Sequence, residues 1–546
     1  MSSSEAENKR EKIAVIGSGT MGAGIAQVCL LAGYRVTLQD LKEELVQAAQ
    51  AQIGRFIRRM AEKGQLDAPE AEAAVSRLSV TTDLEETAQE TSWVIEAIFE
   101  NMEAKRDLFS RLNRLCPAET NFASNTSGLS ISEIGAAGGR PHQTVGLHFF
   151  NPVPLMKLVE VVRGSDTTPE VEQAAIALGQ KLGKTVVVCS DSPNFIVNRI
   201  NRPVGIEAQQ MLQDGLPAQA IDRALVLGAG FKMGPLMTSD LSGVHIGLTV
   251  TENIFKETGD PRFRPVPYVR KLVRAGHTGK KAGKGFYLYP PDSDAPVPRQ
   301  PDIELPQATV PAKIAILGES PEAARFKERL AQAGCQVEDS HEQAELVLIT
   351  ARRSQDYGEF FKELKSQEKQ GVVYALLDPL ASVTEAGFES GQPQNVVGLQ
   401  APLPFMNDKF YEISLGLETA PEAAGMVAAL LEKTGCKYVV MPEIPAGIVL
   451  RVICAMINEA AFSLQEGLAS VEDIDVAMHL GMNYGLGPFQ YADRLGVDKV
   501  LAVLDYLYRE TGDPRYRAAV LLRQMVRAGK LGRSARSGFY KYSTQV

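Results

Sequence analysis

Two polar residues in an apolar, strand-like stretch have the types and spacing of a proton-transfer pair. His148 lies in "TVGLHFFNPVP", and Glu160 follows twelve residues later in "LVEVV". A turn over residues 151–154 would return the second strand beside the first, so that the carboxylate could fix the imidazole tautomer and raise its basicity. Such a histidine can take a hydroxyl proton while hydride leaves the same carbon. The alternative is a buried strand histidine that bonds only to backbone.

Ser127 in "SNTSG" and Asn198 in "NFIVNR" could hold the reacting oxygens of a substrate. Serine and asparagine also cap helices or bond to the backbone, so both residues could equally be structural. A comparison inside the chain bears on this choice.

The chain contains a second, altered copy of this region. "TGDPRFR" at 258 recurs as "TGDPRYR" at 511, and "VGLHFF" at 145 recurs as "VGLQAP" at 397, which is 252 residues later. At that offset Glu412 matches Glu160. The residues opposite Ser127, His148 and Asn198 are Pro379, Gln400 and Leu450. Because the lost residues are those that a catalytic site needs, the pattern predicts an active first half and a structural second half.

Residues 12–40, "KIAVIGSGTMGAGIAQVCLLAGYRVTLQD", predict a strand, a glycine-rich turn, a helix and a second strand that closes on Asp40. In the G-x-G-x-x-G turn, Gly17 permits the tight turn, Gly19 lets the backbone approach a pyrophosphate, and Gly22 lets helix and strand pack closely. A carboxylate at Asp40 would bond ribose hydroxyls and repel a 2′-phosphate, which favours NAD over NADP. The candidate cofactor contacts of this unit are Gly17, Gly19, Thr20, Met21, Gly22 and Asp40.

The second copy has a degenerate version of the same unit. In "KIAILGESPEAARFKERLAQAGCQVEDS" (313–340) only the first glycine, Gly318, remains. The two turns lie 301 residues apart, so the second half lacks about 49 residues, which correspond to a long helical stretch expected near 41–80. That stretch carries Arg55, Arg58, Arg59 and Lys63. The cluster is either a solvated helix face or a cradle for an anionic substrate handle.

The order of the predicted elements indicates the fold class. Strands and helices alternate up to residue 190, and the pattern from Pro193 to about 285 is helical. We expect an α/β Rossmann-type domain and an all-α domain, and then, after a proline-rich linker, a truncated Rossmann-like domain and a second all-α domain. The predicted boundaries, in that order, are 10–190, 191–289, 290–311 for the linker, 312–440 and 441–546.

Composition excludes several classes of protein. A net charge of −9 over 546 residues argues against a general nucleic-acid or membrane-surface binder. Six scattered cysteines without a C-x-x-C pair suggest reduced thiols and no metal site. The polar N-terminus lacks the apolar region of a signal peptide, and no apolar run is long enough to span a membrane. We therefore expect a cytoplasmic protein.

Together the motifs resemble the (S)-3-hydroxyacyl-CoA dehydrogenase family. The matching stretches are "VIGSGTMGAGIA", "VIEAIFENMEAK", "FASNTSGLSI", "GLHFFNPVPLMKLVEVV", "DSPNFIVNR" and "KKAGKGFY". The resemblance covers about residues 10 to 290 with all main motifs, and 312 to 546 in degenerate form. The two-copy layout is similar to bacterial members found in phenylacetate degradation and 3-hydroxybutyryl-CoA metabolism.

The resemblance implies roles for individual residues. His148 would be the catalytic base and Glu160 its partner, while Ser127 and Asn198 would orient the 3-oxygen and the thioester of the substrate. Further implied cofactor contacts are Glu100, Lys105, Asn151 and Lys281. The expected coenzyme A contacts are Lys63, Arg59 and Ser127. Members of the family often have a serine seven residues before that lysine, where this chain has Phe56, so the local CoA contacts differ.

The expected reaction is the NAD-dependent oxidation of a (S)-3-hydroxyacyl-CoA to a 3-oxoacyl-CoA, in fatty-acid or aromatic-acid catabolism. Short linear, 3-hydroxybutyryl and 3-hydroxyadipyl chains all remain open. The alternatives are a β-hydroxyacid or sugar-acid dehydrogenase that does not use CoA, and a non-catalytic NAD-binding scaffold. In the family, the helical domain supplies a dimer interface, so we expect a homodimer or an internal pseudo-dimer of the two helical domains.

Overall fold

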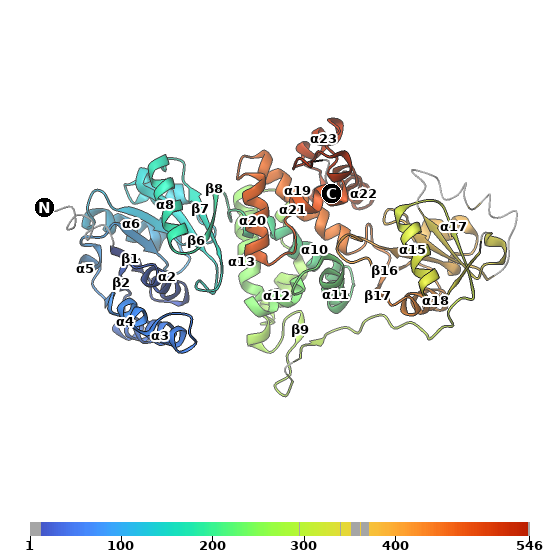
Figure 1. Cartoon of the computed structure of the whole chain (residues 1–546), viewed down its shortest axis with the longest axis horizontal. Helices are drawn as coiled ribbons and strands as arrows, with labels where there is room; N and C mark the ends of the chain where they lie inside the picture. Colours follow the sequence, from blue (N-terminus) through green and yellow to red (C-terminus); the bar gives the residue numbers. More distant parts are fainter. Residues whose placement is uncertain (1–11, 294, 339, 351–360, 362–370, 544–546) are drawn as a thin grey trace. The chain divides into compact units, whose positions relative to one another are not determined.

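The computed structural model describes residues 12–293, 295–338, 340–350, 361 and 371–543 (Figure 1). The chain forms two compact units. The first unit contains the chain up to Ile200 together with Ser463–Gly487, and the second contains Asn201–Phe462 and Pro488–Val546. Each unit therefore combines segments that are far apart in the sequence.

An eight-stranded sheet with the order β3-β2-β1-β4-β5-β6-β7-β8 forms the centre of the first unit. The strands are β1 (Lys12–Ile16), β2 (Arg35–Gln39), β3 (Leu78–Thr81), β4 (Trp93–Glu96), β5 (Asn121–Ser124), β6 (Thr144–Phe149), β7 (Leu158–Arg163) and β8 (Thr185–Ser190). All neighbours are parallel except β6 and β7, which are antiparallel. The central strands are continuously apolar, as expected for parallel strands covered on both faces.

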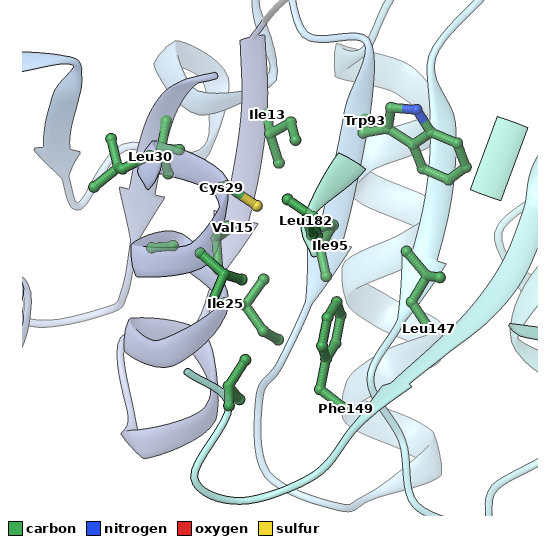
Figure 2. Packing of buried hydrophobic residues seen from close by; sticks show 14 of the residues in the cluster. Ile13, Val15, Ile25, Cys29, Leu30, Trp93, Ile95, Leu147, Phe149 and Leu182 are labelled. Carbon is green, nitrogen blue, oxygen red and sulfur yellow. The ribbon is translucent and has the colours of Figure 1, made fainter. Parts of the chain in front are cut away.

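The helices of the first unit cover this sheet. They are α2 (Thr20–Leu31), α3 (Glu43–Glu62), α4 (Ala68–Ser76), α5 (Leu84–Ala88), α6 (Met102–Leu115), α7 (Ile131–Ala137), α8 (Pro169–Lys181), α9 (Val197–Ile200) and α20 (Val471–Met482). Figure 2 shows how α2 packs on the strands: Ile25 and Cys29 lie beside Val15, and all three side chains are fully buried. The core thus fixes the helix that begins at the glycine turn.

The prediction of a long helical stretch near 41–80 was wrong at its end. Helices α3 and α4 occupy most of it, but Leu78–Thr81 form β3, which pairs in parallel with β2. Leu78 is buried and the strand is short and lies at the edge of the sheet. An edge strand of four residues after a helix gives too little alternation for a period-2 pattern to be recognised.

The second unit contains a seven-stranded sheet with the order β12-β11-β13-β14-β15-β16-β17. The strands are β11 (Lys313–Leu317), β12 (Gln336–Glu338), β13 (Leu346–Thr350), β14 (Val373–Leu377), β15 (Val396–Gln400), β16 (Phe410–Leu415) and β17 (Lys437–Pro442). Only β15 and β16 are antiparallel, as β6 and β7 are in the first sheet. β12 ends at Glu338 and β13 begins at Leu346, whereas the first sheet has α3, α4 and β3 between the equivalent strands. The predicted deletion therefore corresponds to these three elements.

The remaining elements of the second unit are mainly helical. They are α10 (Arg202–Gln213), α11 (Ala218–Ala229), α12 (Pro235–Ser242), α13 (Val244–Thr258), α14 (Pro267–Arg274), β9 (Tyr287–Leu288), β10 (Val297–Pro298), α15 (Pro321–Gln332), α17 (Val383–Ser390), α18 (Pro421–Lys433), α19 (Val449–Gln465), α21 (Pro488–Leu495), α22 (Val497–Thr511) and α23 (Val520–Arg527). Residues 299–312 form no helix or strand. None of the helices in the described ranges has both the length and the apolar character of a membrane span.

Buried ion pairs join the helices of the two copies within the second unit. The Glu207 carboxylate on α10 accepts hydrogen bonds from Arg451 on α19 at 2.7 Å and from the Tyr516 hydroxyl at 2.6 Å. Burial alone would raise the pKa of Glu207, but Arg451 and Arg515 outweigh it and hold that pKa below its usual value. Glu459 and Arg262, at the equivalent positions with the copies exchanged, form the matching pair at 2.5 Å.

In each unit a helix of one copy packs on the sheet of the other. In the first unit α20 lies against β7 and α9, where a Cβ on Gly481 would be 3.1 Å from Leu158. In the second unit α11 lies against β16 and β17, where a Cβ on Gly228 would be 2.7 Å from the Phe410 ring. Gly481 and Gly228 are equivalent in the repeat, as are Leu158 and Phe410. The glycines therefore allow two equivalent close contacts, each between different copies.

Candidate active site

The glycine turn between β1 and α2 has the geometry of an anion site. Gly17 has φ +98°, and a Cβ there would lie 2.6 Å from the Ala97 carbonyl oxygen. A Cβ on Gly22 would lie 1.8 Å from the Gly17 carbonyl oxygen, so both positions require glycine. Above Gly19 there is open space within 4 Å of a Cβ, where a phosphate could approach the backbone. Thr20 and Met21 begin α2 directly after this turn.

Asp40 lies at the end of β2, beside the glycine turn. Its Oδ2 accepts hydrogen bonds from the Ser18 amide at 2.7 Å and the Ser18 hydroxyl at 2.8 Å, and its Oδ1 accepts from the Leu41 amide. A cleft of about 830 Å³ is lined by this carboxylate, by Gly17 and Gly19 and by residues of α6 from Ala104 to Leu115. The volume and the acceptor at its edge fit the adenosine half of a dinucleotide. Ser18, which positions the carboxylate, was not singled out from the sequence.

His148 and Glu160 are directly opposite each other on the antiparallel pair β6 and β7. The distance from His148 Nδ1 to Glu160 Oε2 is 2.5 Å, and the two side chains are buried, with exposed fractions of 8% and 0%. Phe150 and Phe195 flank the imidazole, with ring centroids at 4.5 Å and 5.8 Å. The histidine thus bonds a carboxylate rather than only the backbone, and no hydrogen bond to its Nε2 is found within the described ranges.

The second oxygen of Glu160 is held by the backbone that leads into α9. Oε1 accepts hydrogen bonds from the amides of Ile196 at 3.2 Å and Val197 at 2.9 Å. Both carboxylate oxygens are therefore bonded although the residue is fully buried. These backbone donors hold the carboxylate in place opposite the imidazole.

Ser127 and Asn198 lie 71 residues apart in the chain but meet in the fold. Asn198 Nδ2 donates to the Ser127 carbonyl oxygen at 3.2 Å, and the Ser127 hydroxyl donates to Glu100 Oε1 at 2.9 Å. Neither caps a helix with its side chain, since the cap of α7 is Ser130. The side chain of Asn198 and the backbone of Ser127 thus define one edge of the site.

Glu100 and Lys105, which the resemblance implies as cofactor contacts, are joined with Glu96 in an ionic network that supports this edge of the site. The Lys105 ammonium, only 1% exposed, donates to Glu96 Oε1 at 2.6 Å and lies 3.5 Å from Glu100 Oε2. Ser124 donates to the other oxygen of Glu96 at 2.5 Å. Because its ammonium is enclosed by two carboxylates, Lys105 holds Glu100 and Ser127 in place. The only sequence signal for Glu96 was its place at the end of an apolar strand, in "WVIE".

The predicted CoA contacts lie on the exposed face of α3. Arg59 and Lys63 are exposed at its C-terminal end. Arg58 instead forms an ion pair with Glu72 on α4 at 2.7 Å, so it joins the two helices. Asn151 is exposed, directly after β6, and Asn125 supports that segment by accepting a hydrogen bond from the Phe149 amide. Lys281 is exposed in a short 3₁₀ turn of the second unit, Lys280–Ala282.

The equivalent positions of the second copy are built differently. Ser320 replaces the second glycine of the turn, and its hydroxyl accepts a hydrogen bond from the Ala323 amide at 3.0 Å. Pro321 lacks an amide donor, and Glu322 adds a carboxylate in the first turn of α15. A helix start that is capped by its own side chain and carries a negative charge does not suit a pyrophosphate.

In the second copy the dyad positions hold Gln400 and Glu412. Glu412 is fully buried, and this burial raises the pKa of its carboxyl to about 8. Among the residues that the structure describes, Glu412 Oε2 and Gln400 Oε1 have no hydrogen-bond partner. Within the described ranges, neither copy groups three His, Cys, Asp or Glu side chains as a metal site would require.

Two family models match the chain. Residues 12–192 match "3-hydroxyacyl-CoA dehydrogenase, NAD binding domain", and residues 195–289 and 448–542 both match "3-hydroxyacyl-CoA dehydrogenase, C-terminal domain". The C-terminal model thus matches both copies, and the NAD-binding model matches the first.

Some relatives match nearly the whole chain, and others match only its first half. The 3-hydroxyadipyl-CoA dehydrogenase of Escherichia coli K12 is 33% identical over 516 residues, which are 94% of this chain and 97% of that protein. A probable 3-hydroxybutyryl-CoA dehydrogenase of Bacillus subtilis is 43% identical over 280 residues, which are 51% of this chain and 97% of that protein. The crystal structure of an E. coli 3-hydroxybutyryl-CoA dehydrogenase superimposes with a TM-score of 0.78 at 32% identity, covering 95% of this chain and 98% of that one.

Proposed function

The chain belongs to the 3-hydroxyacyl-CoA dehydrogenase family, and we propose that its first copy carries the whole proton-transfer site, with His148 as general base and Glu160 as its partner. The reaction is the NAD-dependent oxidation of a 3-hydroxyacyl-CoA to a 3-oxoacyl-CoA. The observation that carries the assignment is the 2.5 Å contact between the buried imidazole and the buried carboxylate. A non-catalytic scaffold would not need this pair.

His148 would act through its Nε2. With Nδ1–H donating to Glu160, the neutral imidazole has its lone pair at Nε2 and can accept the proton of the 3-hydroxyl. Glu160, which is held by the amides of Ile196 and Val197, would stabilise the imidazolium that results. In the reverse direction the imidazolium returns this proton to the 3-oxo oxygen.

Ser127 and Asn198 would fix the substrate oxygens relative to His148. Their contact at 3.2 Å and the link from Ser127 to Glu100 provide a pre-formed edge for the 3-oxygen and the thioester. Holding these groups before reaction lowers the entropic part of the barrier.

The cofactor contacts follow from the turn and the cleft. The backbone from Gly17 to Gly22 would hold the pyrophosphate and Asp40 the adenosine ribose, with Glu100 and Asn151 assigned to the remaining contacts. Lys105 is only 1% exposed and bonds Glu96, so it would act on the cofactor only by holding Glu100 in place. When bound, NAD supplies the acceptor for the hydride that leaves C3 of the substrate. The carboxylate at Asp40 supports NAD over NADP because it would repel a 2′-phosphate.

We assign the anionic handle of CoA to Arg59 and Lys63 on the exposed end of α3. Their exposure and their position on a segment deleted from the second copy support this role. 3-Hydroxybutyryl-CoA and 3-hydroxyadipyl-CoA are both candidate substrates, since relatives carry both names. The six free cysteines suit a reducing cytoplasm.

The assay that tests the function follows NADH oxidation with acetoacetyl-CoA, a six-carbon 3-oxoacyl-CoA and 3-oxoadipyl-CoA. We expect a fast wild type and a His148→Gln variant that is slower by about two to four orders of magnitude. Gln is the residue that the second copy already has, and the reciprocal variant Gln400→His is the matched control with unchanged rate. A wild type that binds NADH but reduces none of the three would favour a dehydrogenase that does not use CoA. A His148→Gln variant of normal rate would refute the assignment of the base.

The two copies would form an internal pseudo-dimer. In this division residues 10–190 bind NAD, 191–289 form the first helical domain, and 312–440 and 441–546 replace the second subunit of shorter family members. The equivalent contacts of Gly481 and Gly228 and the paired Glu207 and Glu459 support it. Sedimentation of the full chain should give the mass of one chain, 59.2 kDa. A stable dimer held through these same helical surfaces would contradict the pseudo-dimer.

A further inference from the structure

The second copy has a cleft of about 540 Å³ at the carboxyl end of its sheet. It is lined by the end of β14 and the segment that follows it, by residues 401–405, by Leu450 on α19, and by α21 and α22. These elements are equivalent to those that carry Ser127, His148 and Asn198 in the first copy. The cleft is therefore the counterpart of a catalytic cleft from which the catalytic residues have been lost.

The sheet side of this cleft has changed from polar to apolar. Asn125, Ser127 and Asn198 of the first copy correspond to Leu377, Pro379 and Leu450, all of which line the cleft. Phe405 and Val503 extend the apolar surface. A wall of this kind can bind hydrocarbon but offers nothing to hold a reacting oxygen.

The helical side of the cleft has changed in the opposite direction, from apolar to charged. Leu241 and Ile246 of the first copy correspond to Arg494 at the end of α21 and Lys499 on α22. Both new cations line the cleft and are exposed. No ion pair involves either of them in the described part of the chain. Loss of catalysis would not by itself produce two cations at a cleft mouth in a chain of net charge −9.

The other charged residues of the cleft are already engaged. Arg325 pairs with Glu322 on α15 at 2.9 Å, and Asp378 Oδ1 accepts a hydrogen bond from the Leu380 amide at 2.9 Å. The cleft thus combines an apolar floor with two cations that form no ion pair in the described part of the chain. Its charged lining residues are Glu322, Asp378, Arg325, Arg494 and Lys499, which leave an excess of one positive charge. The self-capped start of α15 and the Glu322 carboxylate disfavour a dinucleotide or another polyphosphate here.

We propose that this cleft binds an amphipathic monocarboxylic acid, with its hydrocarbon chain on Leu377, Leu450 and Phe405 and its carboxylate between Arg494 and Lys499. The site is separate from the reaction site and does not depend on His148. Its ligand would have the chemistry of a free medium-chain fatty acid, and the same acyl chain could also arrive as a CoA thioester. We assign the site to the free acid, because the single charge of one carboxylate matches two monovalent cations better than the several phosphate charges of CoA do.

Titration calorimetry with decanoate tests the proposal on the full-length protein. We expect the wild type to bind one decanoate and the double variant Arg494→Leu/Lys499→Ile to bind it about tenfold or more weakly. These are the residues that the first copy has at the same places, and both wild-type side chains are exposed, so the fold should survive. Equal melting temperatures and equal NADH oxidation rates for the two proteins would verify this.

Four further measurements test the specificity of binding. Arg494→Lys should keep most of the affinity, and Leu450→Asn, which restores the polar residue of the first copy, should lower it several-fold. A cationic detergent of the same chain length should bind at least tenfold more weakly than decanoate, and decanoyl-CoA should not displace decanoate. Absence of decanoate binding, or equal binding by the double variant, would overturn the proposal. Displacement by decanoyl-CoA would overturn the assignment to the free acid.

Discussion

The two dyad positions of this chain show what happens to a buried carboxylate when its partner changes. His148 faces Glu160 on β6 and β7, and Gln400 faces Glu412 on β15 and β16, in the same antiparallel register. In the first copy both carboxylate oxygens are bonded. In the second, one oxygen finds no hydrogen-bond partner in the described part of the chain, and burial raises the pKa of Glu412 to about 8. The fold tolerates the exchange, but the carboxylate no longer faces a group that can take up a proton and carry charge.

The two glycine turns also differ in the features needed to bind a ligand. Gly17 and Gly318 both keep a positive φ, at +98° and +93°, so the backbone turn survives in both copies. The first copy leaves open space at Gly19, whereas the second fills that place with Ser320, which caps the helix itself. Backbone shape was therefore retained after the ligand-binding features were lost.

The strongest test of this comparison is to neutralise the carboxylate in each copy. Glu160→Gln should lower kcat by about two to three orders of magnitude, because an uncharged amide stabilises the imidazolium less. The NADH dissociation constant should change little. The matched variant Glu412→Gln should leave kcat unchanged. A similar loss in both variants would mean that the second copy takes part in the reaction.

Met21→Glu transfers the carboxylate of the second turn to the first. Glu322 occupies the equivalent place at the start of α15. A negative charge beside the pyrophosphate should weaken NADH binding by about ten- to a hundredfold, measured by NADH fluorescence. Glu322→Met in the second copy should have no effect on this constant. Unchanged NADH affinity in Met21→Glu would place the pyrophosphate elsewhere.

Asn198→Leu installs the residue that the second copy has at this position. It removes the 3.2 Å hydrogen bond to the Ser127 carbonyl oxygen. We expect kcat/KM to fall by about tenfold while NADH affinity is kept, because the side chain orients substrate rather than cofactor. If kcat/KM stayed at the wild-type value, Asn198 would be structural only.

The smallest effect concerns the pH dependence of stability. The pKa of Glu412 in the fold, about 8, lies above its ordinary value of 4.5. Between these two values the folded protein binds more protons than the unfolded chain, so this residue makes stability fall as pH rises from about 4.5 to about 8. Glu412→Gln should therefore melt several degrees higher than wild type near pH 8 and show a much smaller difference near pH 5. A difference that is constant with pH would mean that Glu412 is ionised in the fold.

Local patterns predicted a large part of the site. The glycine spacing, the strand that ends at Asp40 and the spacing of His148 and Glu160 across a turn all depend on backbone periodicity within about 40 residues. The error at β3 has the same origin, because a four-residue edge strand provides too few positions for a period to emerge. The Glu96–Lys105 pair was missed because a charged residue in a strand does not reveal whether its partner will be buried with it. Ser18 was missed because a serine in a turn does not reveal which carboxylate it will bond.

The sequence by itself determined the Rossmann-type unit, the duplication with its deleted segment, and the position of the altered residues, because these are properties of spacing along one chain. Only the tertiary structure brought Asn198 to Ser127 and enclosed Lys105 between two carboxylates. It also packed α20 and α11 each on the sheet of the other copy, and it placed Arg494 and Lys499 at an apolar cleft. Such contacts join residues tens to hundreds of positions apart, and the many weak packing interactions that select them leave no period in the sequence.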